Sequence, residues 1–495
     1  MEKKPLLPKP KEGESLLNIR NLVMGNIVAV LYHVASAFHA PTLDQYLYKR
    51  LSLEVFGNYS GDSVSPANVT CYSNKTSEGY ILQEMAQKAT TSQQMYFSLV
   101  NTAAALVGSL VLGSYSDYFG RKVVFILPAI GDMVRSAMLT AIIHWELDLN
   151  WYYIGEFLCG LGSTNSGILL ASYAYAADNT PPRKSRTLAI AVIDTTSSIA
   201  YAGTSAATGY FIQDMGYFYP SLVSALIMWV LILVVVFFIR ESKHSLKKTN
   251  KSKVNLTQGI RNVVGLYLFD NTCRVRSLFW LGLMCYFFSQ ISANAVININ
   301  TLFMMNLPFC WTPERIGYFT MASTMAKQLL GVPLIKLLHY CIGDEVIGVF
   351  SAFTFIVADL LHGLATTDWM MYGYAMAGAL SFAAVPVIRA IMSRMAPKDS
   401  QGSLFTSLTL ADKVGGLMFI PSFAYIYEAT VNFMRGFIFL VFAGTHVVAF
   451  MLLILFACLT YKHNRRIEHD DTVTIQDTEW RQPTSQSNLA QSTEM

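Results

Sequence analysis

The chain has 495 residues, of which 53% are apolar and 14% are charged. An ordinary soluble domain has about 25% charged residues, and a soluble chain of this length could not bury so much apolar surface. A net charge of +4 gives no support to nucleic-acid binding, and seven scattered cysteines do not form a disulfide framework or a zinc site. The composition therefore predicts a polytopic membrane protein and excludes a soluble enzyme.

Windows of about 20 mainly apolar residues predict twelve membrane-spanning helices. The first six lie near 23–43, 93–115, 123–144, 152–175, 187–211 and 218–239, and the last six near 277–303, 316–337, 346–366, 370–391, 403–425 and 437–460. The predicted domains are a tail at 1–22, a six-helix bundle at 23–240 with a long loop at 44–92, a basic linker at 241–276, a second six-helix bundle at 277–460 and a tail at 461–495. Two pseudo-symmetric six-helix bundles are typical of secondary transporters.

The distribution of lysine and arginine sets the predicted orientation. When both termini are placed in the cytosol, most of the 36 basic residues fall on cytosolic segments, as the positive-inside rule requires. The loop after the first span then faces the secretory lumen, and it contains three glycosylation sequons, at Asn58, Asn68 and Asn74. We therefore expect a glycoprotein with cytosolic termini.

Cysteine placement agrees with this topology. Only Cys71 and Cys310, in the loops after spans 1 and 7, lie on the oxidising side. The placement favours a disulfide that ties the two halves together, and two free thiols are the alternative.

The loop between spans 2 and 3 carries a recognisable motif. Its residues, Gly113-Ser-Tyr-Ser-Asp117-Tyr-Phe-Gly120-Arg121-Lys122, fit the pattern Gly-x-x-x-Asp-x-x-Gly-Arg-Lys. This pattern resembles the loop 2–3 signature of the major facilitator superfamily, in which such a polar latch holds one conformation shut. A plain charged turn explains the two basic residues but not the spacing.

Further segments, found in order from span 1 to span 12, resemble the proton-coupled folate transporter family, solute carrier family 46, which includes a lysosomal solute exporter. They are Pro41-Thr-Leu-Asp-Gln-Tyr46, Pro308-Phe-Cys310-Trp311 with Ile316-Gly317-Tyr318, Pro386-Val-Ile-Arg389-Ala, Gln401-Gly402-x-Leu404-Phe405 and Ala429-Thr-x-Asn-Phe-Met-x-Gly436. The resemblance implies a disulfide between Cys71 and Cys310, a proton-coupling acid at Asp194 and a substrate-site arginine at Arg389.

The chain also departs from the folate transporter. The position of a proton-coupling histidine in span 7 falls on Ala293, and the position of a span 4 acid falls on Thr164, which we include among the candidate substrate-binding residues. These departures favour the lysosomal exporter type over a folate carrier.

Charged residues inside predicted spans cost about 2.5–3.5 kcal/mol each at a helix centre unless they are paired or hydrated. Asp194 is either the coupling acid or a structural partner of a basic group, and Arg389 either binds substrate or extends its guanidinium to the interface. Asp412, rather than the adjacent Lys413, is our further candidate for substrate binding. Asp132 and Arg135, spaced i,i+3 in span 3, are expected to form a structural ion pair.

These features predict a proton-coupled secondary transporter that moves an organic anion or amphipathic solute, such as a steroid conjugate, a peptide fragment or a folate-like molecule, from an acidic compartment to the cytosol. The alternative is a transport-silent receptor or scaffold with a transporter fold. We expect no enzyme activity, cofactor, metal or nucleic-acid partner, because no such motif is present. Glu2, Leu6 and Leu7 fit an acidic dileucine signal read by clathrin adaptors, which favours the lysosomal membrane over the plasma membrane.

Overall fold

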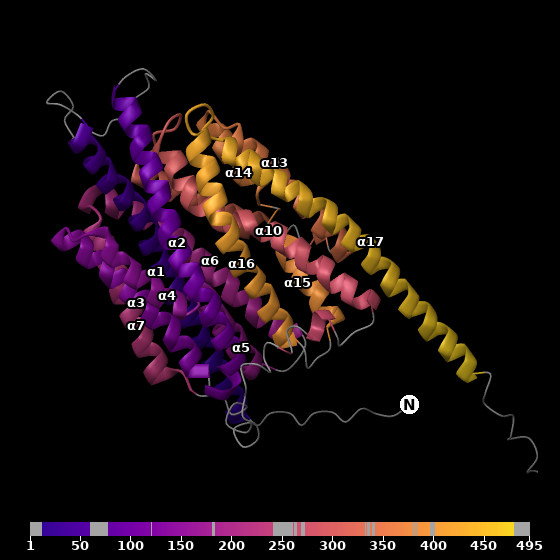
Figure 1. Ribbon diagram of the computed structural model, residues 1–495. Coiled ribbons are helices and arrows are strands. Elements are labelled where there is room, and N and C mark those ends of the chain that lie inside the picture. The colour runs from indigo at the N-terminus through magenta and orange to yellow at the C-terminus, as the bar shows by residue number, and fades with distance from the viewer. Residues whose placement is uncertain are drawn as a thin grey trace, which may run out of the picture.

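The computed structural model describes residues 12–59, 78–119, 121–180, 184–240, 261, 265–268, 273–331, 333, 337–338, 342–379, 381, 384–396 and 401–479. These residues are almost entirely helical and include no strand. Figure 1 shows the helices of the first half of the chain gathered beside those of the second half. The predicted all-α fold is confirmed for the part of the chain that the structure describes.

The first half contains α1 (Glu12–Tyr59), α2 (Glu78–Phe119), α3 (Arg121–Trp145), the 3-10 turn η1 (Leu149–Trp151), α4 (Tyr152–Leu161), α5 (Thr164–Asn179), α6 (Lys184–Met215) and α7 (Phe218–Phe238). The second half contains α10 (Cys273–Met305), α11 (Pro313–Ala326), the π-helix η2 (Lys327–Gly331), α13 (Asp344–Gly363), α14 (Asp368–Ala377), α15 (Ala384–Met395), α16 (Gln401–Thr430) and α17 (Phe437–Glu479). Figure 1 shows that α17 runs on past the neighbouring helices.

Six of the described helices are long and apolar enough to cross a membrane. They are parts of α1, α2, α3, α7, α13 and α17. The count of twelve spans and the cytosolic placement of the termini stay predictions. We call the end of the bundle where α1 ends and α2 begins the first-loop end, and the end where α7 leads into residues 241–276 the linker end. In the predicted topology these ends face the lumen and the cytosol.

The predicted spans 4, 8 and 10 are not single α-helices. Span 4 is divided into α4 and α5, span 10 into α14 and α15, and span 8 changes from α11 to the π-helix η2. At the first break Ser163 and Thr164 have φ angles of 62° and 53°, a left-handed conformation that residues other than glycine adopt rarely. The break also allows a close approach, because a Cβ at Gly162 would lie 2.6 Å from the Cα of Pro128 on α3.

Each half has its own buried core. In the first half the core includes Val28, Phe125 and Leu231, and in the second half Phe279 and Phe456 are fully buried. Burying an aromatic or branched aliphatic side chain contributes about 1.5–3 kcal/mol, so each half is held together by many such contributions. The halves can therefore move as two separately packed units.

The two halves meet along α2 with α16 and along α6 with α11. Polar side chains join them at the first-loop end. Asn306, the residue after α10, accepts hydrogen bonds from Tyr48 (2.9 Å) and Gln83 (2.8 Å), and Thr301 on α10 donates to Asp44 across the same boundary (3.3 Å). These contacts hold the halves together at the end that the topology places on the luminal side.

Backbone contact between α6 and α11 depends on glycine. A Cβ at Gly209 would lie 2.5 Å from the carbonyl oxygen of Pro313, whereas a Cβ at Gly203 on the same helix meets nothing within 4 Å. We expect the leucine of Gly209→Leu to oppose the close packing of α6 on α11 at a cost of about 1–3 kcal/mol. This cost lowers the ratio of the conformation in which the two helices touch to the one in which they are apart roughly 5- to 150-fold. Solute transport per molecule should fall accordingly in reconstituted vesicles.

Gly203→Leu is the matched control and should transport normally. Equal transport by the Gly209→Leu and Gly203→Leu variants would show that the close packing of α6 on α11 is not needed.

Cys310 forms a disulfide, and Cys159, Cys273, Cys285 and Cys458 are free. The partner of Cys310 is not among the described residues, so the pairing of Cys310 with Cys71 stays a prediction. Asn58 lies on α1, but its side chain is outside the described set, and Asn68 and Asn74 are outside the described residues. The dileucine residues Glu2, Leu6 and Leu7 are also outside them.

Candidate functional site

Asp194 lies on α6, where its half-buried carboxylate accepts a hydrogen bond from the hydroxyl of Tyr173 on α5. His33 on α1 is close enough for its charge to act on Asp194. The same face of α1 binds α6 again through Asn26, which accepts a hydrogen bond of 2.8 Å from Thr196. Three helices of the first half thus position one carboxylate.

Arg389 lies on α15, the part of span 10 that follows the break. Its guanidinium donates a 2.8 Å hydrogen bond to the hydroxyl of Tyr286 on α10 and lies 5.2 Å from the centre of that ring. Asp412 on α16 acts electrostatically on Tyr286, and its carboxylate is 3.7 Å from the ammonium group of Lys413. Tyr286 on α10 thus positions the guanidinium of α15, and Asp412 on α16 acts on the same tyrosine.

These two groups belong to opposite halves, and Arg389 is close enough for its positive charge to act on both Asp194 and Tyr173. Sequence reasoning selected Asp194 and Arg389 and missed the two tyrosines that hold them. No spacing pattern could have found Tyr173 or Tyr286, because each meets its partner only through the packing of separate helices.

Thr164 is the first residue of α5 and lies at the break in span 4 with a positive φ angle. The corresponding span of the second half is also broken, between α14 and α15. Interrupted helices at equivalent positions of two halves are typical of transporter binding sites. Because α5 carries Tyr173 and α15 carries Arg389, both half-helices reach the candidate site.

Part of the loop 2–3 motif is described. Arg121 forms an ion pair of 2.9 Å with Asp178 at the end of α5, and Lys122 donates to the carbonyl oxygen of Val236 near the end of α7. A cation at the C-terminal end of a helix is favourable because of the helix dipole. Gly113 and Asp117 lie on α2, but the structure does not describe the side chain of Asp117, and Gly120 is outside the described residues. The latch therefore stays a prediction.

A second buried ionisable pair, in the second half, was not predicted. The ring of His446 on α17 lies 2.6 Å from Asp359 on α13 through Nδ1 and 3.0 Å from Ser292 on α10 through Nε2. Ionisable residues inside membrane spans are unusual enough to mark both positions as candidates. The sequence does not show that they pair, because the two residues lie on different helices. The three side chains tie α10, α13 and α17 together.

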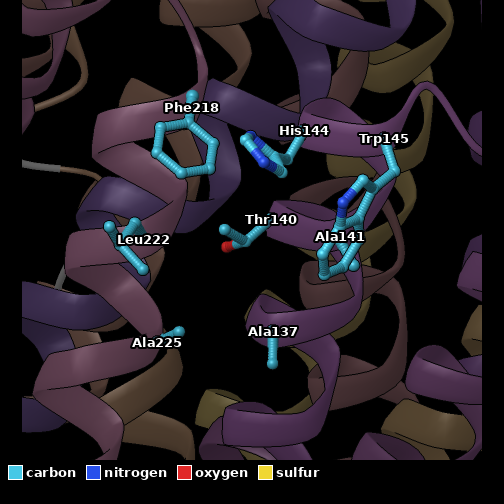
Figure 2. A pocket seen from close by; sticks show the side chains of 8 residues that line it. All are labelled: Ala137, Thr140, Ala141, His144, Trp145, Phe218, Leu222 and Ala225. Carbon is cyan, nitrogen blue, oxygen red and sulfur yellow. The ribbon is translucent and has the colours of Figure 1, made fainter.

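One hollow lies apart from the candidate site, between α3 and α7 near the first-loop end. It has a volume of about 260 Å³ and is lined by Ala137, Thr140, Ala141, His144, Trp145, Phe218, Leu222 and Ala225. Figure 2 shows Thr140 and His144 on one wall and Phe218 and Leu222 on the other. No residue of the Asp194–Arg389 site lines it.

Residues 25–289, more than half of the chain, match the family model of the Major Facilitator Superfamily. The human lysosomal proton-coupled steroid conjugate and bile acid symporter SLC46A3 is 28% identical over 86% of this chain and 92% of its own length. The bovine proton-coupled folate transporter is 27% identical over 84% of this chain and 87% of its own length.

Solved structures give the same fold. The inward-open xylose transporter XylE from E. coli has a TM-score of 0.61 at 13% identity, covering 88% of this chain and 96% of its own. The human organic anion transporter MFSD10 has a TM-score of 0.59 at 14% identity, covering 88% and 99%. At these identities the likeness shows the fold alone.

Proposed function

Because the chain belongs to the Major Facilitator Superfamily, we propose that it moves an organic anion or amphipathic solute together with protons from an acidic compartment to the cytosol. The observation that carries the proposal is the pair of opposite charges, Asp194 on one half and Arg389 on the other. Its relatives include proton-coupled symporters for steroid conjugates, bile acids and folate. No enzyme occurs among these relatives.

The two charges suggest how a proton and an anion are coupled. While Asp194 is ionised, its negative charge competes with an anionic solute for Arg389. Protonation of Asp194 removes that competition and leaves the guanidinium, a good partner for a carboxylate or sulfate, to the solute. By thermodynamic linkage the solute then raises the affinity of Asp194 for its proton. Solute affinity should therefore rise as the pH falls.

The site also suggests the solute class. The guanidinium of Arg389 lies over the ring of Tyr286, and it is close enough for its charge to act on Tyr173. One cation beside aromatic rings suits a solute with an anionic group and an apolar body. Asp412 lies on α16, which packs against α10, and Thr164 lies on α5, which packs against α6. We assign both residues to the same site as substrate-contacting residues.

We place the protein in the lysosomal membrane, as for the SLC46A3 relatives. An acidic lumen provides the proton gradient that the mechanism uses. The dileucine signal at Glu2, Leu6 and Leu7 would bring the protein there through clathrin adaptors.

Proteoliposomes that contain the purified protein test the function directly. With an acidic medium outside and a neutral lumen, we expect saturable uptake of a radiolabelled steroid sulfate, and collapse of the pH difference with a protonophore should stop accumulation. Uptake that is pH-independent and unsaturable for steroid sulfates, bile acids and folates alike would contradict the proposal and favour a receptor or scaffold role.

A further inference from the structure

A buried cluster of charges lies within the first half, separate from Asp194. Arg135 on α3 is 2.5 Å from Asp132 on the same helix and 3.7 Å from Glu156 on α4. Asp132 is fully buried and Glu156 is 4% exposed. The sequence predicted the Asp132–Arg135 pair, and the structure confirms it, but Glu156 adds a second carboxylate. Two carboxylates and one guanidinium leave one negative charge in excess, which a buried site does not hold without compensation.

The two carboxylates have unequal partners. Besides Arg135, Asp132 accepts hydrogen bonds from the hydroxyl of Tyr32 on α1 (2.9 Å) and the thiol of Cys159 on α4 (3.2 Å). Glu156 has the longer contact to Arg135 and accepts one amide hydrogen bond from Asn101 on α2 (2.8 Å). A proton is held at the lowest cost on the carboxylate that lies farther from the guanidinium and has fewer hydrogen-bond donors. The compensating proton therefore belongs on Glu156.

The remaining titratable groups that face the cluster, among the described residues, are Tyr32 and His39 on α1 and Tyr152 and Cys159 on α4. His39 contacts no carboxylate in the described part of the chain, and Arg135 lies near enough to oppose a second positive charge there. A neutral imidazole holds a proton on one ring nitrogen and accepts one on the other. His39 thus suits proton passage better than proton storage.

Hydrogen-bonding groups lead from Glu156 toward the first-loop end. Tyr152 is close enough to Glu156 for the two groups to interact electrostatically, and its hydroxyl lies 2.8 Å from Nε2 of His39. Nδ1 of His39 is 3.2 Å from the hydroxyl of Ser136, which is 3.2 Å from the hydroxyl of Ser224 on α7. One turn nearer the first-loop end, the hydroxyls of Thr140 on α3 and Ser221 on α7 are 2.9 Å apart. Thr140 lines the hollow between α3 and α7 (Figure 2). The series ends near the side that the topology exposes to acid.

We propose that Glu156 is a second proton-carrying residue of this transporter, with Arg135 and Asp132 as its fixed charge partners. The proposal rests on the proton coupling proposed above. The Glu156 carboxyl gains its proton through His39 and Tyr152 and becomes a carboxylate when the proton leaves. The carboxylate is then drawn toward Arg135. Since Glu156 lies on α4, just before the break at Gly162 and Ser163, this movement can shift α4 without bending α5.

The test counts protons in proteoliposomes, with a pH-sensitive dye inside and radiolabelled steroid sulfate as the probe. Glu156→Gln keeps a neutral side chain of the same shape, so we expect solute exchange to continue while one proton fewer moves with each solute. Asp132→Asn should have the same effect, because Glu156 then becomes the remaining anionic partner of Arg135 and stays ionised. Glu54→Gln, which changes an exposed glutamate on α1, is the matched control and should keep the wild-type ratio.

Each result has a distinct meaning. A wild-type proton-to-solute ratio in either folded variant, Glu156→Gln or Asp132→Asn, would overturn the role of Glu156. Steroid sulfate uptake without proton movement in the wild-type protein would instead overturn the proposed coupling itself. The two variants provide independent tests, so a folding failure of one leaves the other to decide.

Discussion

Asp194→Asn is expected to remove the share of pH-driven solute accumulation that the proton of Asp194 supplies, while solute exchange continues. Asparagine has the shape of the protonated carboxyl, and its oxygen can still accept the hydrogen bond from Tyr173. One pH unit supplies about 1.4 kcal/mol per proton, which sustains at most about tenfold accumulation when one proton accompanies each solute. The accumulation ratio of the variant should fall about tenfold per unit of pH difference, to the level that the proton on Glu156 sustains, measured with radiolabelled steroid sulfate at matched amounts of protein.

Asp214→Asn is the control for this experiment, because Asp214 is an exposed residue near the other end of α6. Reduced abundance with normal transport per molecule would assign Asp194 a structural role. Normal accumulation by the Asp194→Asn variant would remove this residue from the coupling mechanism.

The second large effect is expected at Arg389. In the proposed mechanism Arg389 pairs with the anionic group of the solute, and removal of one partner of such a charge pair costs about 2–5 kcal/mol. Arg389→Ala should therefore raise the solute concentration for half-maximal exchange more than about 30-fold. Arg389→Lys keeps the charge but loses the planar fork and part of the stacking on Tyr286, and we expect a loss of about tenfold. Concentration dependence of exchange at fixed acidic pH measures both.

Two further variants separate the contributions at this site. Tyr286→Phe keeps the ring and removes the hydroxyl, so it should weaken binding less than Arg389→Ala. Arg394→Ala changes an exposed arginine in the last turn of the same helix and should leave solute affinity unchanged. An unchanged solute affinity in the Arg389→Ala variant would mean that Arg389 does not bind the solute and only extends its guanidinium to the membrane interface.

The fold could be predicted from the sequence because its strongest determinants are local. Apolar windows identify helices whatever their neighbours are, and Gly-x-x-x-Asp-x-x-Gly-Arg-Lys is read directly from residues 113–122. The breaks in spans 4 and 10 could not be predicted, because glycine is common in continuous membrane helices. The close approach of Pro128 on α3 to Gly162 is a contact between separate helices, which the sequence around Gly162 does not reveal.

The candidate site was predictable in part. Asp194 and Arg389 were found through intramembrane charge and family resemblance, but their tyrosine partners were not. Arg135 shows the limit most clearly. Its i,i+3 partner Asp132 is visible in the sequence, whereas Glu156 joins the cluster through the packing of α4 on α3. That third charge changes a neutral pair into a site with one negative charge in excess.

Proton movement driven by solute tests the central claim most directly. Proteoliposomes with equal pH on both sides, a permeant ion to clamp the membrane potential and an internal pH dye receive steroid sulfate on one side. If proton and solute cross together, the solute gradient alone acidifies the lumen, and Asp194→Asn reduces the number of protons that enter with each solute while exchange of labelled solute continues. Solute entry with no change of internal pH in the wild-type protein would contradict proton-coupled transport.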